Sequence, residues 1–310
     1  MDYHIPVMVA EVVAGLVADP DGAYVDATAG GGGHSWALLQ ALGPKGRLLA
    51  VDRDREAVAA ARARLAADTD TRVGVRQGRF TELSELLAQE GIGPLSGALF
   101  DLGVSSHQID APARGFSYQA DGPLDMRMDA EVGLTAAELI AACSEAELAE
   151  LIARYGEERA ARQIARAICR QQRLAPLVTT RALREAIATT RPRMLNKTLA
   201  RVFQALRIAV NDELGQLQAG LVAVETELKP GGRLVVMAYH SLEDRLVKQH
   251  LAALMRGCIC PPRVPICTCG RKPSFKRVGC KLQRASKAEV EQNSRARSAI
   301  LRVYEKTEAG

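Results

Sequence analysis

The stretch Tyr24-Val-Asp-Ala-Thr-Ala-Gly-Gly-Gly-Gly-His-Ser-Trp36 decides which fold this chain is expected to adopt. Tyr24–Asp26 is typical of the end of a short buried strand. The four glycines that follow can take positive φ angles and let a ligand approach bare backbone. His34 then begins a helix, whose first N–H groups have no partner inside the helix. A strand, a glycine turn and a helix N-terminus in this order predict a binding site for a nucleotide-type ligand.

Two classes of cofactor use such a turn. The spacing Gly30-x-Gly32-x-x-Ser35 approximates the dinucleotide fingerprint, but a serine stands where a third glycine or alanine is usual. The spacing Asp26-x-x-x-Gly30-x-Gly32 more closely resembles the first motif of class I methyltransferases that use S-adenosylmethionine. There, a carboxylate at Asp26 can bind the α-ammonium group of the cofactor, which a dinucleotide lacks. The better match therefore predicts S-adenosylmethionine, in contact with the glycines Gly30, Gly31, Gly32 and Gly33.

Length and composition are those of a globular protein. The chain has 310 residues, of which 47% are hydrophobic and 25% are charged. We expect no signal peptide, because the N-terminus lacks a basic region, and no apolar run approaches the roughly 20 residues of a membrane span. Seven unevenly spaced cysteines fit reduced thiols or a metal site better than a disulfide framework. These features predict a cytoplasmic protein that does not associate with a membrane.

Charge is distributed unevenly along the chain, although the net charge is only +5. Residues 156–207 contain 12 Lys/Arg and 3 Asp/Glu, and residues 245–287 contain 11 Lys/Arg and no Asp/Glu. The remainder of the chain is therefore acidic. Two basic stretches of this kind favour a polyanionic partner. An aromatic content of 4% argues against an extended surface for stacking bases.

Strands and helices alternate after the glycine turn. Apolar runs predict strands at Arg47–Val51, Val73–Gln77 and Gly97–Phe100, with a helix at Glu56–Leu65. This alternation predicts an α/β fold with an open, twisted, mostly parallel sheet and helices on both faces. Ligands bind such sheets at the carboxyl ends of the strands. Four candidate site residues fall at such ends: Asp26, Asp52, Phe80 and Asp101. We expect Asp52 to accept from both ribose hydroxyls and Phe80 to cover the adenine.

The alternation stops near Asp110. From there to Lys197 the sequence predicts a polar loop and helices, at Thr135–Ala142, Glu145–Tyr155, Glu158–Arg173 and Arg181–Thr189. We interpret residues 110–197 as a helical domain inserted into a domain made of residues 1–109 and 198–310. The sheet is expected to resume after a long helix, with the remaining elements at Thr198–Leu228, Arg233–Ala238 and Ser298–Tyr304.

Motifs spread over nearly the whole chain resemble those of the RsmH (MraW) family of bacterial 16S rRNA methyltransferases. They include Asp26-Ala-Thr-Ala-Gly-Gly-Gly-Gly-His-Ser35, Phe100-Asp-Leu-Gly-Val-Ser-Ser106, Asp121-Gly-Pro-Leu-Asp-Met-Arg-Met-Asp129 and His240-Ser-Leu-Glu-Asp-Arg245. The resemblance implies a class I methyltransferase fold and methyl transfer from S-adenosylmethionine to the exocyclic N4 of a decoding-centre cytidine. It implies 16S rRNA or the small ribosomal subunit as partner, with rRNA recognition by the insert; nothing in the sequence indicates a protein partner. The cofactor contacts that it implies are Gly32, Gly33, His34, Asp52, Phe80, Asp101 and Gln108.

Methylation of an exocyclic amine requires positioning more than a strong base. Hydrogen-bond acceptors on the N4 protons favour the sp³ character that a nucleophile needs, and in-line placement supplies several kcal/mol. Asp101 ends the fourth strand, where DNA amino-methyltransferases carry an Asp/Asn-Pro-Pro-aromatic motif, so we place it in the site. Its partner there is either the cofactor or the target amine. Further catalytic candidates are Ser105, Ser106 and His240.

Two other functions compete with this interpretation. A non-catalytic RNA-binding or ribosome-assembly factor would keep the fold without the chemistry, although the three strand-end carboxylates argue against it. A nicotinamide dehydrogenase is disfavoured by Ser35 and by the lack of a candidate proton donor beside a hydride site.

A cysteine cluster near the C-terminus leaves two possibilities open. The spacing Cys258-x-Cys260-x6-Cys267-x-Cys269 either holds one zinc ion through four thiolates or forms a reduced loop braced by prolines. Its one-residue gaps are tighter than the two-residue gaps of most zinc sites. Since relatives vary here, we expect no catalytic role and assign no metal to the methyl-transfer site.

Overall fold

The computed structural model describes residues 6–67, 69–261, 266 and 268–308, with Ser106 described by its backbone only. The chain divides into two compact units, one of residues 1–103 and 215–310 and the other of residues 104–214. The second unit spans more residues than the predicted insert of residues 110–197. It includes helix α10 (Leu195–Asn211) because Val202, Phe203 and Leu206 of this helix pack into its core.

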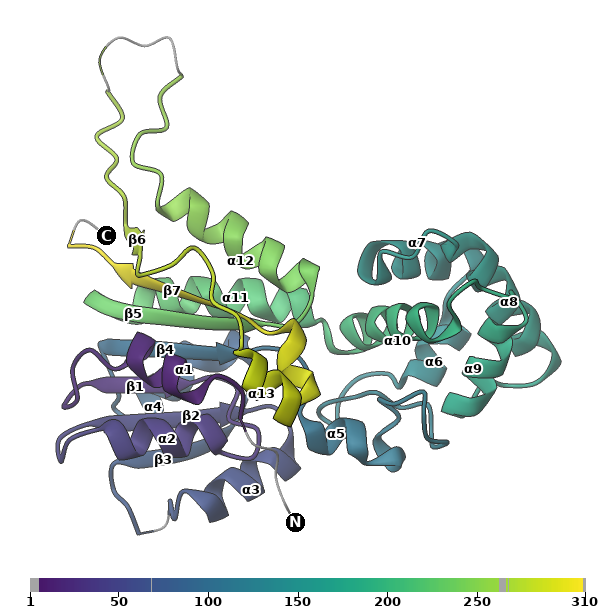
Figure 1. Ribbon diagram of the computed structural model, residues 1–310, viewed down its shortest axis with the longest axis horizontal. Helices are drawn as coiled ribbons and strands as arrows, with labels where there is room; N and C mark the ends of the chain where they lie inside the picture. The colour runs from purple at the N-terminus through teal and green to yellow at the C-terminus, as the bar shows by residue number, and fades with distance from the viewer. Residues whose placement is uncertain (1–5, 68, 262–265, 267, 309–310) are drawn as a thin grey trace. The chain divides into compact units, whose positions relative to one another are not determined.

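A seven-stranded sheet forms the centre of the first unit (Figure 1). Its order is β3-β2-β1-β4-β5-β7-β6, with strands β1 (Ala23–Asp26), β2 (Arg47–Asp52), β3 (Val73–Gln77), β4 (Leu95–Asp101), β5 (Leu228–Ala238), β6 (Phe275–Arg277) and β7 (Ile300–Lys306). Strands β1 to β5 pair in parallel, and β7 is antiparallel to both of its neighbours. The prediction of an open, mostly parallel sheet is therefore confirmed.

Strand order reverses at the centre of this sheet. From β1 the chain builds outward through β2 and β3, and then returns to place β4 on the other side of β1. In the register, Val25 is flanked by Leu49 of β2 and Ala98 of β4. An open α/β sheet binds its ligand where the order reverses, at the carboxyl ends of the strands. The glycine loop follows β1 and so begins at that point.

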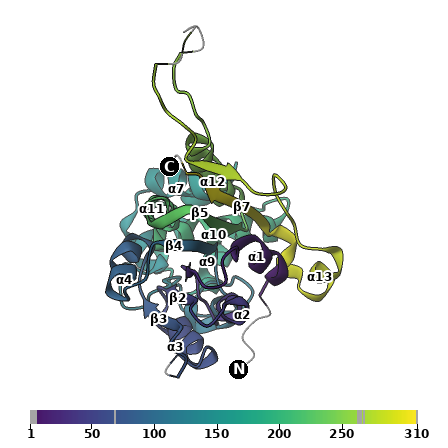
Figure 2. The same cartoon turned by 90° about the vertical axis from the view of Figure 1, so that its left-hand side faces the viewer.

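Two sets of helices cover the two faces of the sheet. One set comprises α1 (Val9–Leu16), α2 (Gly33–Ala41) and α3 (Arg55–Arg64), and the other comprises α4 (Leu83–Gln89), α11 (Glu213–Glu227) and α12 (Ser241–Leu254). Figure 2 shows α4 and α11 on one side of the strands and α1 on the other. Successive strand residues enter opposite cores, as Tyr24 and Val25 do, because side chains alternate along a strand. A small helix α13 (Lys287–Gln292) precedes β7.

A predicted helix and two predicted strands differ from the structure. Strand β5 begins at Leu228 rather than at Arg233. The long helix expected at 198–228 is two helices, α10 and α11, which are separated at Asp212 with a φ angle of 46°. The side chain of Asn211 accepts from the Met128 amide and donates to the Met126 carbonyl, which fixes the end of α10. The last strand begins at Ile300 rather than at residue 298, because Ser294–Ser298 forms a 3₁₀ turn.

Helices make up the second unit, as the sequence predicts. They are α5 (Ser106–Asp110), α6 (Ala136–Ala142), α7 (Glu145–Gly156), α8 (Ala161–Leu174), α9 (Thr180–Ala188) and α10. Helices α6 and α7 begin at reciprocal capping boxes, in which the hydroxyls of Thr135 and Ser144 accept from backbone amides. Among the described residues of this unit there is no strand, only an isolated bridge between Pro123 and Thr179. In the described part of the chain, every helix is too short or too polar to span a bilayer.

Candidate active site

The glycine loop needs glycine for two separate reasons. Gly30 and Gly32 have φ angles of 50° and 76°, in the left-handed region that other residues avoid. A Cβ on Gly32 would also lie 3.1 Å from the Cα of Ala61, because helix α3 packs directly against the loop. Gly32 precedes α2 without a capping side chain, so Gly33 and His34 form a helix N-terminus of the type that accepts negative or polar ligand groups.

Asp52 ties the end of β2 to this loop. Its Oδ2 accepts from the Gly30 amide at 2.7 Å, and its Oδ1 accepts from the Asp54 amide at 2.9 Å. Burial raises the pKa of Asp52 to about 6, although these two amide hydrogen bonds act to lower it. The carboxyl is therefore mainly ionised at neutral pH. An ionised carboxylate has about four lone-pair sites, so two remain to accept from the ribose hydroxyls of a cofactor.

Asp26 has a different role from the one that the sequence predicts. Its side chain is 0% exposed, and its oxygens accept from the Ser35 hydroxyl at 2.6 Å and the Thr28 amide at 3.1 Å. Burial raises the pKa of Asp26, while the hydrogen bond from Ser35 and the charge of His34 lower it. A cofactor ammonium cannot reach a carboxylate that is sealed in this way. The prediction of direct contact is wrong, and Asp26 instead joins the end of β1 to the start of α2.

Three groups fix Asp101 at the end of β4. Its Oδ1 accepts from the Tyr239 hydroxyl at 2.9 Å, its Oδ2 lies 3.3 Å from His34 Nδ1, and its backbone amide donates to Thr28 Oγ1 at 2.6 Å. His34 Nε2 lies 2.8 Å from the Val7 carbonyl oxygen, which only accepts, so Nε2 must carry a hydrogen. The carboxylate is thus held between a phenol and an imidazole.

The imidazole of His34 is a cation at neutral pH. Burial lowers its pKa, but the hydrogen bond and charge of Asp101, the charge of Asp26 and the Val7 carbonyl raise it, to about 9. The pair formed with Asp101 is therefore an ion pair with one buried partner and one partner whose side chain is 23% exposed. It joins the N-terminus of α2 to the end of β4, across the strand β1 that lies between β2 and β4.

Phe80 lies on the 3₁₀ turn Phe80–Glu82 that follows β3. Its ring packs edge-on against Phe100 with a centroid separation of 5.0 Å and an interplanar angle of 83°. Helix α11 approaches this pair at Gly220, where a Cβ would lie 2.9 Å from the Phe100 ring and 3.0 Å from Phe80 Cβ. Phe80 remains partly exposed, so one aromatic surface is available to a cofactor at this edge.

His240 caps a helix in this structure. Its Nδ1 accepts from the Glu243 amide at 3.4 Å, and its Nε2 lies 3.0 Å from Glu243 Oε1. The side chain is 11% exposed. The structure therefore shows that His240 caps the start of α12, and the catalytic role that the sequence predicts for it stays a prediction.

Ser105 and Gln108 form the capping box of α5 in the second unit. Ser105 Oγ accepts from the Gln108 amide at 3.2 Å, and Gln108 Oε1 accepts from the Ser105 amide at 3.0 Å. The side chain of Ser106, the other serine predicted for the site, lies outside the described residues. The structure thus gives Ser105 and Gln108 a local structural function, and the predicted cofactor contact of Gln108 stays a prediction.

Tyr239 and Thr28 are site residues that the sequence analysis missed. Tyr239 directly follows β5, which pairs with β4, and Thr28 follows β1, which pairs with β4 on its other side. Their positions after strands were visible in the sequence. Their contact with Asp101 depends on which strands are neighbours, and that order is a property of the folded sheet.

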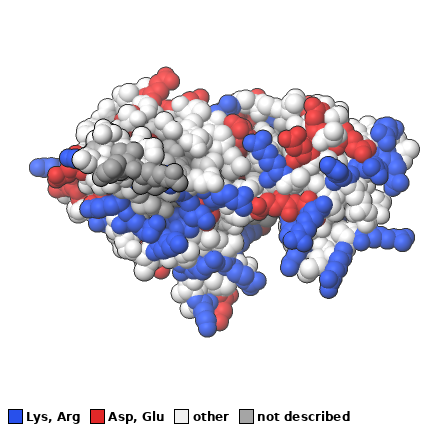
Figure 3. Space-filling model, turned by 90° about the horizontal axis from the view of Figure 1, so that it is seen from above, with Lys and Arg blue, Asp and Glu red and all other residues white. Residues whose placement is uncertain are grey.

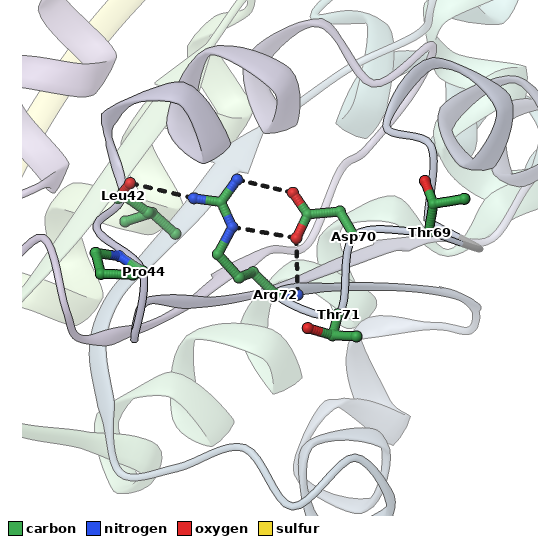
Figure 4. A pocket seen from close by; sticks show the side chains of 6 residues that line it. All are labelled: Leu42, Pro44, Thr69, Asp70, Thr71 and Arg72. Atoms are coloured by element: carbon green, nitrogen blue, oxygen red, sulfur yellow. Dashed lines mark hydrogen bonds and ion pairs between the residues drawn. The ribbon is translucent and has the colours of Figure 1, made fainter.

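A separate depression lies at the other end of the strands (Figure 4). Its lining comes from the segments that lead into β2 and β3, including Leu42, Pro44 and Thr69. Arg72 lies within it and donates to both carboxylate oxygens of Asp70, at 2.7 and 3.1 Å, and to the Leu42 carbonyl at 3.3 Å. The guanidinium of Arg72 and the carboxylate of Asp70, the main charged groups of this depression, already pair with each other. The depression also lies away from the carboxyl ends of the strands, where the candidate residues gather.

Comparisons with known proteins all indicate the same family. Residues 1–307 match the MraW methylase family. Proteins described as ribosomal RNA small subunit methyltransferase H are similar over their full length. The relative from Trichlorobacter lovleyi is 46% identical over 98% of both chains, and that from Symbiobacterium thermophilum is 46% identical over 99% of this chain and 98% of its own. The relative from Geotalea uraniireducens is 48% identical over 98% of both chains.

Proposed function

Because this chain belongs to the MraW methylase family, an S-adenosylmethionine-dependent rRNA methyltransferase family, we propose that it methylates the exocyclic N4 amine of a decoding-centre cytidine in 16S rRNA. The observation that carries the proposal is the row of strand-end groups on the first unit. Asp52 follows β2, the glycine loop follows β1 and Asp101 follows β4, three neighbouring strands of one sheet. This row offers a cofactor site and a carboxylate beside it.

The residues at this edge fit S-adenosylmethionine. The cofactor supplies a methyl group on a sulfonium centre, which is a strong electrophile. Asp52 would hold its ribose, Phe80 would cover its adenine, and the backbone of Gly32 and Gly33 would contact its polar groups. Each of these groups is fixed by a neighbouring element, which limits the rearrangement that binding requires. His34 is buried and paired, so it would support the site through Asp101 rather than by contact.

Asp101 would act on the target amine. Its carboxylate already accepts from Tyr239 and pairs with His34, which leaves lone pairs on both oxygens. A hydrogen bond from the N4 amine to this carboxylate would orient the nitrogen lone pair toward the methyl carbon. The Asp101 carboxylate, or water, would take the proton that the nitrogen loses as it is methylated. Since the amine becomes acidic only as the methyl group arrives, an ordinary carboxylate suffices.

The second unit would bind the rRNA. Helix α8 buries Ile164, Ala165 and Ile168 and exposes four arginines on its other side, Arg162, Arg166, Arg170 and Arg173. Spacings of three and four residues place these arginines on one face. The Arg166–Glu145 pair is 74% and 42% exposed, so it is weak and can give way to a phosphate. Figure 3 shows Lys and Arg side chains projecting from the surface over several parts of the chain.

Methyl transfer to small ribosomal subunits tests the activity. Subunits from cells that lack the modification would be incubated with the protein and S-adenosylmethionine carrying a labelled methyl group. We expect label in N4-methylcytidine after digestion to nucleosides, at a rate that falls by at least about a hundredfold in the Asp101→Ala variant. Naked 16S rRNA in a parallel reaction would identify the preferred substrate.

Two outcomes would contradict the proposal. Label in another nucleoside would mean that the protein is a methyltransferase with a different target atom. RNA binding without any label transfer would favour a non-catalytic assembly factor that retains the fold. If the small ribosomal subunit is the substrate, as proposed, the protein would act in the cytoplasm.

A further inference from the structure

An arm connects helix α12 to strand β6 in the first unit. It leaves α12 after Leu254 and returns to β6 at Phe275, and Figure 1 shows it projecting away from the sheet. At its base the Ser274 amide donates to the Leu254 carbonyl at 3.0 Å. Further out, the apolar side chains Ile259 and Ile266 are 58% and 77% exposed. The described part of the arm therefore has no hydrophobic core that would hold its two sides together.

Three cysteines bring the two sides of the arm together. The Sγ atoms of Cys258, Cys260 and Cys269 all lie within 4.8 Å of one another. Cys258 and Cys260 are on the outgoing side, and Cys269 is on the returning side. The Sγ atoms of Cys258 and Cys269 are 3.8 Å apart, and the Cys260 amide donates to Cys258 Sγ at 3.3 Å. An amide that donates to sulfur is favourable for a thiolate, the form that binds metals.

The sulfur spacing distinguishes a metal site from a disulfide. Two thiolates that bind one zinc ion tetrahedrally, with Zn–S bonds of about 2.3 Å, are about 3.8 Å apart. Sulfur atoms in a disulfide are only about 2.05 Å apart. The observed separation of 3.8 Å matches the edge of a zinc tetrahedron. Soft thiolate ligands also favour zinc over magnesium or calcium, which prefer oxygen.

We propose that Cys258, Cys260 and Cys269 bind one structural zinc ion that holds the two sides of this arm together beyond its base. Structural zinc sites have four ligands, and these three thiolates supply all but one of them. Cys267, which stands two positions before Cys269 in the sequence, lies outside the described residues. The ion takes the place of the missing hydrophobic core, as metals do in small structures that bury little apolar surface. It lies on a different segment from the methyl-transfer residues and is not part of the reaction.

Metal analysis of the full-length protein tests the site. The protein would be purified under reducing conditions, without a polyhistidine tag, from cells grown with zinc. We expect about one zinc ion per chain, and its loss in the double variant Cys258→Ser/Cys269→Ser. The matched control is Cys280→Ser, which removes an exposed thiol from the same basic region and should retain the zinc. Less than about half an equivalent in the natural protein, or zinc that persists in the double variant, would overturn the proposal.

Two further measurements separate the site from folding defects and from oxidation. Replacement of zinc by cobalt should produce thiolate-to-metal absorption in the natural protein and in Cys280→Ser, but not in the double variant. Circular dichroism should show that the double variant keeps its helices, because neither Cys258 nor Cys269 is part of a hydrophobic core. A Cys258–Cys269 disulfide, found by mass spectrometry of the reduced preparation as a loss of two hydrogens, would contradict the zinc site.

Discussion

The carboxyl edge of the sheet and the outer face of helix α8 use charge in opposite ways. At the sheet edge, Asp26, Asp52 and Asp101 each accept hydrogen bonds from fixed protein donors, and Asp26 has no contact with solvent. On α8 the arginines project into solvent, and Arg166, which pairs with Glu145, is itself mostly exposed. A chemical step requires atoms placed to a fraction of an ångström, whereas attraction to a phosphate backbone requires charge of the right sign. A change at the edge should therefore disrupt geometry, and a change on α8 should disrupt only affinity.

The largest effect is expected at Asp101. Asp101→Ala removes the carboxylate that orients the amine, so turnover should fall by roughly 10²–10⁴-fold. Tyr239→Phe is the matched control, because it keeps the carboxylate and removes one donor to it, and its turnover should fall by roughly tenfold. Single-turnover kinetics with saturating cofactor would measure both. Near-normal turnover in Asp101→Ala, with affinity for S-adenosylmethionine reduced instead, would assign Asp101 to the cofactor.

A smaller effect is expected from the His34–Asp101 pair. Because the pKa of His34 is raised from 6.5 to about 9 on folding, its stabilisation is fully present below pH 6.5 and is lost as pH rises through 9. A shift of this size corresponds to about 3 kcal/mol. Urea unfolding at pH 6.5 and 9.5 should show this loss in the natural protein and not in His34→Gln. All other groups titrate in the same way in the natural protein and in His34→Gln. An equal loss of unfolding free energy in the two proteins would therefore refute the assignment of His34 as a buried cation.

Asp52 should govern the affinity for the cofactor. Asp52→Ala should weaken binding of S-adenosylmethionine by about 1.5–3 kcal/mol, since a charged acceptor for two hydroxyls is lost. Because burial raises the pKa of Asp52 to about 6, the natural protein should also bind more weakly as pH falls through 6, and the variant should lose this dependence. Titration calorimetry measures both effects. Asp54→Ser keeps a capping side chain for α3 and is the control; unchanged affinity in Asp52→Ala would contradict the ribose contact.

The smallest effect per residue is expected on α8. Arg170→Gln/Arg173→Gln should raise the Michaelis constant for RNA and leave the cofactor affinity unchanged. Each lost phosphate contact flattens the slope of log affinity against log salt by about 0.7, so two should flatten it by about 1.4. The control, Lys45→Gln/Arg47→Gln, neutralises two exposed charges at the start of β2. If both pairs behave alike, α8 does not bind RNA and a protein partner becomes the better explanation for its charge.

Local features of the chain were sufficient for most elements of the fold. The apolar runs that become β2, β3 and β4 could be located because a buried parallel strand is hydrophobic on both faces. Helices α6 and α7 were predictable from their capping residues, and the glycine loop from its composition. The cofactor class was predicted from the spacing Asp26-x-x-x-Gly30-x-Gly32, although Asp26 itself proves to be buried rather than open to a ligand.

Contacts between distant segments were decided only by the tertiary structure. The sequence places Asp26 and Asp101 at strand ends alike, yet Ser35 and Thr28 enclose the first while the second keeps a side chain 23% exposed. Tyr239 reaches Asp101 from 138 positions away because β5 pairs with β4. Burial and strand order depend on how all the elements pack together, so no local pattern carries them. Local sequence thus specifies which groups reach the edge of the sheet, whereas the packing of the folded chain sets which of them are open to a ligand.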